Sequence, residues 1–193
     1  MKKYFFLLLM LTAMFAGTNA QSLNAVAGLL FKNIKTKLTV AEKNQIASSL
    51  GFVLSDDKDL PFAQDANSKE YPFSAFVYPT DMNKDGKEEI FISFGNTYTS
   101  GQDGQNISLF IKNSAGRYQE QLGFPGTVPD MLSTGFAGYP DLLIGGAGFE
   151  YPVLRWNGKT YANYRTVKDA DYGKLKMTNT AEVSKKYQAG LPN

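Results

Sequence analysis

The spacing of hydrophobic residues follows a helical period in the first part of the chain. Between residues 22 and 50, apolar positions recur every three or four residues, which is the pattern of an amphipathic helix. The positions that define this pattern are Leu23, Val26, Leu29, Leu30 and Phe31. The polar faces mix positive and negative charges, which favours helices that cap a sheet over helices that lie on a membrane.

The second of these helices has clear boundary signals. The segment Thr39-Val40-Ala41-Glu42 fits a capping box, in which Thr39 caps the helix and Glu42 bonds back to the amide of Thr39. Gly51 is placed to end the helix, because glycine readily adopts the left-handed conformation of a C-terminal cap. These signals predict a helix that begins after Thr39 and ends at Gly51.

From Tyr71 onward the pattern changes to short runs of aromatic and β-branched residues, separated by Gly, Pro, Asn and Asp. Such a texture predicts β-strands joined by turns. Asn157-Gly158 is the strongest hairpin signal, because this pair favours a two-residue type I′ turn. The expected strands are 73–78, 89–94, 107–112, 118–122, 141–144, 153–156 and 160–165, and a short helix is expected at 180–188.

A weak internal repeat organises these strands. One copy reads DGKEEIFISFGN and then ISLFIKNSAGRY, and the other reads AGYPDLLIGGAG and then PVLRWNGKTY. Repeats of about 40 to 50 residues are typical of propeller blades, but two units are too few to close a ring. We therefore expect a mainly β (α+β) fold in which two propeller-blade-like antiparallel repeats form an open sheet or sandwich, capped by the N-terminal helices.

The chain begins with MKKYFFLLLMLTAMFAGTNA, in which two lysines precede an apolar run and small residues end the segment. This is the pattern of a secretory signal peptide, and the apolar run is too short to span a bilayer. Absence of cysteine argues against a lipid anchor, so a periplasmic or extracellular protein without a transmembrane segment is expected. The predicted regions are 1–20 (signal peptide), 21–70 (helical cap), 71–168 (β repeats with one calcium loop) and 169–193 (polar tail with a short helix).

Charge and composition exclude several classes of function. Without Lys2 and Lys3, 18 of the 20 basic residues remain against 18 acidic ones, and the lysines are scattered, so nucleic-acid binding is disfavoured. The chain has no histidine and no cysteine, which excludes Ser-His-Asp and Cys-His catalysis, the usual zinc sites and thiol redox chemistry. The chemistries left open are those of carboxylates, of Ser-Lys arrangements and of metals with oxygen ligands.

The stretch DMNKDGKEE, directly before the expected strand 89–94, carries the clearest chemical signal. Asp81, Asn83 and Asp85 stand at positions 1, 3 and 5, which turns oxygen-bearing side chains toward one point. Gly86 permits a sharp bend, and Lys87 offers its carbonyl oxygen as a ligand. Glu89 at position 9 can reach back so that its carboxylate also contacts the ion. Position 12 lies inside the strand, so the loop is not an EF-hand.

A polar turn is the alternative interpretation of this loop, because Asp, Asn and Gly form turns without metal. The alignment of four oxygen-bearing side chains with a glycine favours the metal site. Calcium, which prefers six to eight oxygen ligands, is the expected ion, and magnesium is left open.

The loop and the following strand, DMNKDGKEEIFISFG, resemble the FG-GAP or VCBS type of repeat, whose D-x-[DN]-x-D-G loop binds calcium between strands of a propeller blade. The block PDLLIGGAGFEYPVLRWNGKTY is similar to a recurrent block in small secreted bacterial proteins of uncharacterised function. The resemblance implies one calcium site. Its side-chain ligands would be Asp81, Asn83, Asp85 and Glu89, with Lys87 as a backbone ligand.

The second copy of the repeat departs from this pattern. Ser133, Gly135 and Ala137 stand where the first three ligands would be, and Gly138 and Asp141 persist. We therefore expect a fold that is retained in the second copy without an ion.

We expect the ion to be structural, and the protein to be a binding module for an unknown protein or glycan partner. The polar insertion 95–106 is the expected contact surface, because long loops on rigid sheets often carry recognition. An inhibitor, an immunity factor and an adhesin component all fit this class. Among the aromatic residues, Tyr98 is expected to be exposed, and Trp156 is expected to lie in the core.

Two other classes of function are left open by the sequence. A carboxylate-dependent hydrolase acting on cell-wall or other glycans would use a pair from Asp130, Asp141 and Glu150, at a separation that sequence cannot measure. A passive structural component of the envelope or matrix would self-associate. No residue is assigned a catalytic role.

Overall fold

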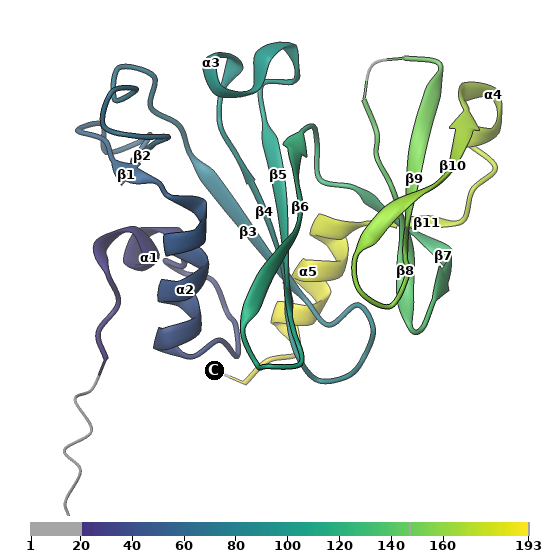
Figure 1. Cartoon of the computed structure of the whole chain (residues 1–193), viewed down its shortest axis with the longest axis horizontal. Coiled ribbons are helices and arrows are strands. Elements are labelled where there is room, and N and C mark those ends of the chain that lie inside the picture. Colours follow the sequence, from purple (N-terminus) through teal and green to yellow (C-terminus); the bar gives the residue numbers. More distant parts are fainter. Residues whose placement is uncertain (1–20, 147, 193) are drawn as a thin grey trace, which may run out of the picture.

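The computed structural model describes residues 21–146 and 148–192 (Figure 1). The expected signal peptide, residues 1–20, lies outside the described residues. The described chain is mainly β, with two multi-stranded antiparallel sheets and a few helices. Within it, no helix is both long and apolar enough to cross a membrane.

Each large sheet contains four strands that follow one another along the chain. The first sheet has the order β3-β4-β5-β6, and the second has the order β10-β9-β8-β7-β11. The first sheet is built from β3 (Ala75–Thr80), β4 (Glu89–Phe94), β5 (Asn106–Lys112) and β6 (Tyr118–Pro125). The second is built from β7 (Asp130–Phe136), β8 (Tyr139–Leu143), β9 (Glu150–Trp156), β10 (Tyr161–Lys168) and β11 (Met177–Asn179). A small third sheet pairs β1 (Val53–Leu54) with β2 (Phe62–Ala63).

The helices lie at the two ends of the described chain and in the insertion. They are α1 (Ala25–Leu30), α2 (Val40–Leu50), α3 (Thr97–Ser100), the 3-10 helix η1 (Gly101–Asp103), α4 (Asp169–Tyr172) and α5 (Thr180–Ala189). The capping box of α2 is confirmed, since Thr39 and Glu42 exchange both expected hydrogen bonds, and Gly51 ends the helix with a φ of 72°. The expected C-terminal helix is also confirmed as α5.

Strand β4 is buried on both of its faces, which explains why four of the six residues in its sequence EIFISF are apolar and follow almost without interruption. Ile90 and Ile92 pack in a cluster with α1 and α2, whereas Phe91 packs in a second cluster with residues of the second sheet, such as Leu142 and Leu154. The first sheet therefore lies between the N-terminal helices and the second sheet, and Figure 1 shows these parts in that order.

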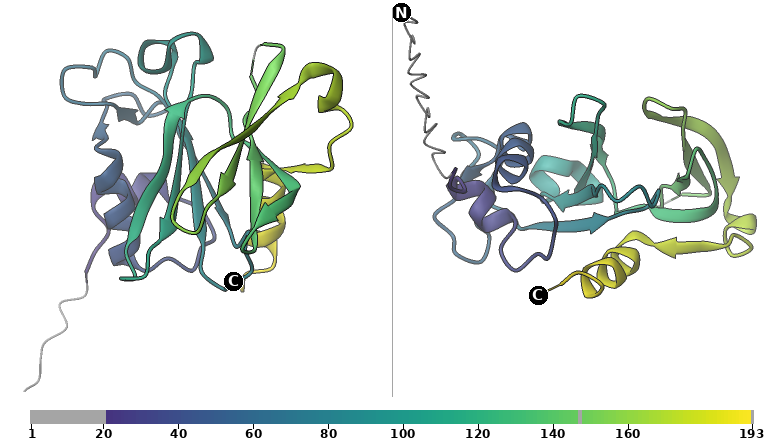
Figure 2. Two further views of the ribbon diagram at one scale, coloured as in Figure 1. Left: turned by 45° about the vertical axis from the view of Figure 1, so that its right-hand side comes forward. Right: turned by 90° about the horizontal axis from the view of Figure 1, so that it is seen from below.

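The C-terminal segment returns to the first sheet. Strand β11 pairs with β7, and α5 then lies beside β3, as the view from below in Figure 2 shows. The Thr180 hydroxyl donates to the Pro129 carbonyl at 2.7 Å, which fixes the start of the helix beside the link between the sheets.

The expected type I′ turn at Asn157-Gly158 is wrong. Strand β9 ends at Trp156 and β10 begins at Tyr161, so four residues form the connection. The Asn157 side chain accepts hydrogen bonds from the amides of Lys159 and Thr160, both at 3.0 Å, and this stabilises the longer loop.

The second copy of the repeat also differs from expectation. Ser133 and Gly135 do not lie in a loop, because both belong to strand β7. Only Ala137 and Gly138 form the turn to β8, with φ angles of 50° and 84°. Ala137 carries no oxygen side chain, and the two-residue connection leaves no loop of the kind that joins β3 to β4.

Candidate metal centre

The stretch DMNKDGKEE forms the connection from β3 to β4, and it makes a tight, irregular turn. Lys84 and Gly86 both have positive φ angles, of 60° and 83°. A positive φ is unusual for lysine and easy for glycine. The loop therefore bends sharply at both places, which turns its polar side chains back over its own backbone.

Three of the predicted ligands bind amides within the loop. The Gly86 amide donates to the two Asp81 carboxylate oxygens at 3.2 and 3.1 Å. The Asp85 amide donates to Asn83 Oδ1 at 3.0 Å, and the Lys87 amide donates to Asp85 Oδ1 at 2.8 Å. These bonds order the loop, and they fit both a metal loop and a metal-free turn.

Glu89 is the deeply buried member of the set, with 2% of its surface exposed. The Met82 amide donates to Glu89 Oε2 at 2.9 Å. Burial, together with the negative charges of Asp85 and Asp81, raises the pKa of Glu89 to about 8. The carboxylates of Asp85 and Asp81 thus disfavour the charged form of Glu89, and a bound cation would favour it.

The corresponding residue in the second sheet, Asp141, is also buried, but it has a cationic partner. Arg155 Nε and an Arg155 terminal nitrogen donate to its two oxygens, both at 2.7 Å, and the Thr134 hydroxyl donates at 2.5 Å. Burial alone would raise the pKa of Asp141, but the bonds from Arg155 and Thr134 outweigh burial and lower the pKa.

Strand register explains the difference between the two acids. Leu142 pairs with Leu154, so one step further Asp141 stands opposite Arg155. Ile90 pairs with Phe110, so the same step places Ile111 opposite Glu89. Glu89 takes part in none of the ion pairs found among the described residues.

The structure places four of the predicted residues in the β3–β4 loop and Glu89 at the first position of β4, but it does not show a preassembled cluster. Among residues 21–146 and 148–192, no group of three or more acidic side chains is arranged to hold a metal. Lys87 extends its side chain to within 4.0 Å of the Asp85 carboxylate and is largely exposed. The chemistry of the set still suits a hard cation, because all four proposed side-chain ligands offer oxygen.

Sequence reasoning missed the role of Glu88, which is buried beside Glu89. Its carboxylate accepts a hydrogen bond from the Lys37 amide at 2.8 Å and a second bond from the Thr36 hydroxyl. The Tyr118 hydroxyl donates to the Glu88 carbonyl at 3.0 Å. The only sequence signal was a second glutamate directly before an apolar strand. Glu88 attaches the N-terminal segment to the loop.

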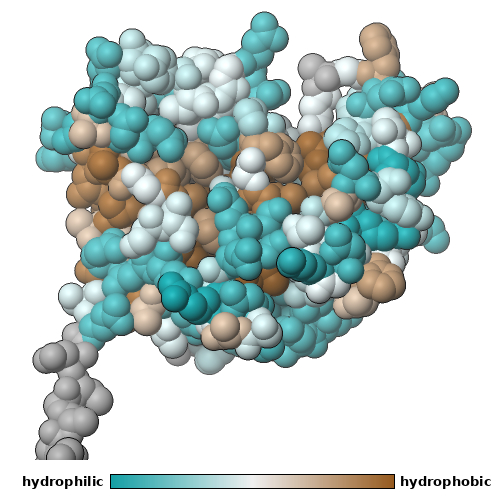
Figure 3. Space-filling view, viewed as in Figure 1, coloured by the Kyte–Doolittle hydropathy of each residue, from teal (hydrophilic) through white to brown (hydrophobic). Residues whose placement is uncertain are grey.

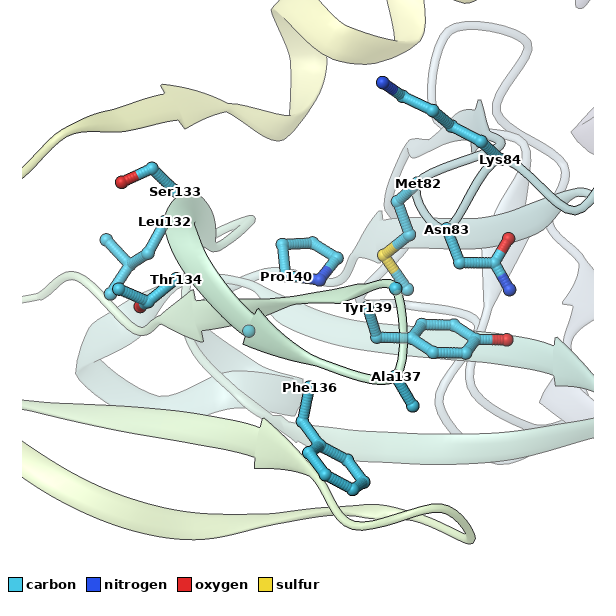
Figure 4. Close-up of a pocket in the computed structure, with 12 residues that line it drawn as sticks. Met82, Asn83, Lys84, Leu132, Ser133, Thr134, Phe136, Ala137, Tyr139 and Pro140 are labelled. Atoms are coloured by element: carbon cyan, nitrogen blue, oxygen red, sulfur yellow. The ribbon is translucent and has the colours of Figure 1, made fainter.

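The other side of the loop packs against the hairpin of β7 and β8. A cavity of about 450 Å³ lies between Met82, Asn83 and Lys84 of the loop and residues 132–140 of the hairpin (Figure 4). A Cβ atom added to Gly138 would lie 3.4 Å from the Asn83 carbonyl oxygen. The loop therefore contacts both the N-terminal segment and the second sheet.

The carboxylates considered for hydrolysis are in separate environments. Asp141 forms an ion pair with Arg155, and Asp130 accepts hydrogen bonds from Tyr172 and Asn179. Glu150 is exposed at the start of β9. A hydrolytic role for any of these carboxylates stays a prediction.

The two expectations about aromatic residues are supported by their surroundings. Tyr98 is 60% exposed, as expected for the insertion. Trp156 is partly buried and packs against Tyr139, with ring centroids 4.7 Å apart, and against Tyr161 at 5.5 Å.

Comparison with known proteins gave no relative. No protein-family model matches the chain, and neither the curated proteins nor the solved structures contain a match.

Proposed function

We propose that the chain is a secreted interaction protein whose β module is stabilised by one calcium ion in the loop from Asp81 to Glu89. The observation that carries this proposal is the contrast between two buried acids. Asp141 is neutralised by Arg155, whereas Glu89 has two further carboxylates nearby and no cationic side chain paired with it in the described chain. A divalent cation supplies the charge that Arg155 supplies in the second sheet.

The ligands would be the side chains of Asp81, Asn83, Asp85 and Glu89 and the carbonyl of Lys87. This all-oxygen set in an irregular loop favours calcium, because magnesium demands a near-ideal octahedron and retains more of its water. The ion would neutralise the carboxylates of the loop and would take no part in catalysis. In line with the FG-GAP or VCBS resemblance, the proposal also takes the two large sheets as propeller-blade-like repeats capped by α1 and α2.

A structural role follows from what the loop touches. Glu88 holds the N-terminal segment, and Asn83 lies against the β7–β8 turn. An ion that orders the loop would therefore stabilise three parts of the molecule together. By linkage, calcium at a hundred times its dissociation constant adds about 2.7 kcal/mol to the free energy of unfolding.

The interaction surface would be the insertion 95–106, which connects β4 to β5 and forms α3 and η1 at one end of the first sheet (Figure 1). Its partner would be a protein or a glycan, and an inhibitor or immunity factor fits such a surface. The expected location is periplasmic or extracellular.

Thermal unfolding of the chain from Gln21, in EDTA, calcium or magnesium, tests the metal site. We expect calcium to raise the unfolding midpoint of the parent by several degrees and to leave Asp85→Ala unchanged. Asp103→Ala, which removes an exposed carboxylate from the insertion, is the matched control and should respond as the parent does. A parent midpoint that no cation shifts would show that the loop is only a turn.

A further inference from the structure

Two exposed tyrosines, one in the insertion and one before β3, stack face to face. The rings of Tyr71 and Tyr98 are stacked, with centroids 3.7 Å apart and planes inclined by 5°. Tyr71 is 38% exposed and Tyr98 is 60% exposed. Neither ring belongs to a hydrophobic core cluster of the described residues. Packing of the core therefore does not explain the pair.

One side chain fixes both tyrosines. Asn96 Nδ2 donates to the Tyr71 carbonyl at 2.9 Å and to the Pro72 carbonyl at 3.1 Å. Asn96 Oδ1 accepts from the Tyr98 amide at 2.9 Å and from the Thr99 amide at 3.1 Å. The stacked arrangement is thus held by the backbone of two separate segments, and it is preorganised before any ligand binds.

The preceding glycine limits the freedom of this loop further. Gly95 has a φ of 107°, and a Cβ atom there would lie 2.6 Å from both the Thr99 and the Ser100 hydroxyl oxygens. The start of the insertion is therefore closely packed, and Tyr98 is presented from a rigid base.

The surroundings of the pair are polar and partly acidic. The loop sequence GNTYTSGQDGQN contains no aliphatic side chain other than the short threonine methyls. Thr97, Gln102 and Asp103 are exposed, and the negative charge of Glu70 raises the pKa of Tyr71. Figure 3 shows mainly hydrophilic and neutral residues at the end of the molecule where α3 lies.

We propose that Tyr71 and Tyr98 form a stacking platform for an uncharged saccharide. This inference rests on the proposed function and names the ligand class of the same surface. A pyranose ring has an apolar C–H face edged by hydroxyl groups. Stacking on Tyr71 covers one face of the Tyr98 ring, and the 60% exposure of Tyr98 leaves its other face as the surface for a sugar ring. The exposed neighbours in the chain, Thr97, Gln102 and Asp103, offer hydroxyl, amide and carboxylate groups for sugar hydroxyls.

Other ligand classes fit this surface less well. Nucleobases also stack on tyrosine, but the carboxylates of Glu70 and Asp103 would repel the phosphate backbone. A protein partner needs an apolar interface core built from several residues, whereas this platform offers one pair of rings in a polar surround.

Calorimetric titration of the calcium-loaded chain with four tetrasaccharides tests the proposal. The probes are the β-1,4-linked oligomers of glucose, N-acetylglucosamine, xylose and mannose. We expect binding of at least one probe, weakened about three- to tenfold by Tyr98→Ala, which is the range expected for one aromatic stacking contact. Tyr98→Phe should retain the affinity.

The control is Phe149→Ala, which removes an aromatic side chain that is 84% exposed in the second sheet region, and it should leave affinity unchanged. Absence of binding to all four probes, or binding that Tyr98→Ala does not weaken, would overturn the saccharide assignment. The calcium response in thermal unfolding is measured on the same samples. A calcium response without saccharide binding would overturn the platform alone, whereas absence of the calcium response would overturn the calcium module.

Discussion

At the residue scale, two buried acids on the second strands of the two large sheets, Glu89 on β4 and Asp141 on β8, are satisfied in different ways. The cross-strand neighbour decides the outcome, because Arg155 stands opposite Asp141 and Ile111 stands opposite Glu89. A single-sequence pattern shows the acids but not their partners, since strand register is a property of the folded sheet. For this reason the sequence located the candidate metal loop but did not reveal the Asp141–Arg155 ion pair.

The ion pair predicts a pH dependence that Asp141→Asn should remove. The pKa of Asp141 is lowered in the folded chain, so the pair stabilises fully above the unfolded value of about 3.9 and loses this contribution as pH falls through the lower folded value. At pH 7 the substitution should cost about 1 to 3 kcal/mol, because the buried carboxylate loses its charge-assisted hydrogen bonds while the Arg155 side chain stays partly exposed to water.

Urea unfolding of the parent and Asp141→Asn at pH 7, 4 and 2.5 measures this dependence. The difference in unfolding free energy between the two proteins should shrink at pH 2.5. A difference that is constant across this range would mean that the carboxylate charge contributes nothing to the pair.

At the element scale, the longer strands that are rich in apolar residues were predictable, whereas β7 and the short strands β1, β2 and β11 were not. All seven expected strands overlap observed ones. In β7, DMLSTGF loses its apolar pattern after Leu132, because the rest of the strand is exposed. Small polar residues there resemble a loop, and only pairing with β8 and β11 makes them a strand.

Close approach of β8 to β7 explains why a glycine stands at position 135, and it predicts the effect of a substitution there. A Cβ atom at Gly135 would lie 2.1 Å from the Tyr139 carbonyl oxygen and 2.9 Å from Pro140 Cα, both of them backbone atoms. Gly135→Ala should therefore force the hairpin apart and lower the free energy of unfolding by about 2 kcal/mol or more, as overpacking does.

Gly28→Ala is the matched substitution for this test. Gly28 lies in α1, and a Cβ atom there would meet nothing within 4 Å, so alanine should stabilise the protein by about 0.5 to 1 kcal/mol. Denaturant unfolding of both variants measures the two changes in the free energy of unfolding. Equal effects of the two substitutions would contradict the close packing of β7 on β8.

At the scale of the whole molecule, the β3–β4 loop is the place where separate parts of the chain meet. The N-terminal segment is bound to Glu88, and the β7–β8 turn packs on Asn83. The sequence predicted a mainly β chain and the position of this loop. It did not show these contacts, because they join residues that are far apart in the chain.

These contacts predict that calcium protects more than its own loop. Hydrogen exchange of the chain from Gln21, with calcium and with EDTA, should show slower exchange with calcium at residues 81–89, at the Thr36–Lys37 amides and in the β7–β8 turn. The reason is that an ordered loop holds the carboxylate of Glu88 and the backbone of Asn83 against their partners, which lowers the frequency of local opening. Asp85→Ala should show no calcium effect at any of these places. Protection confined to residues 81–89 in the parent would mean that the ion orders only its own loop, and that the sheets and the N-terminal segment are held together without it.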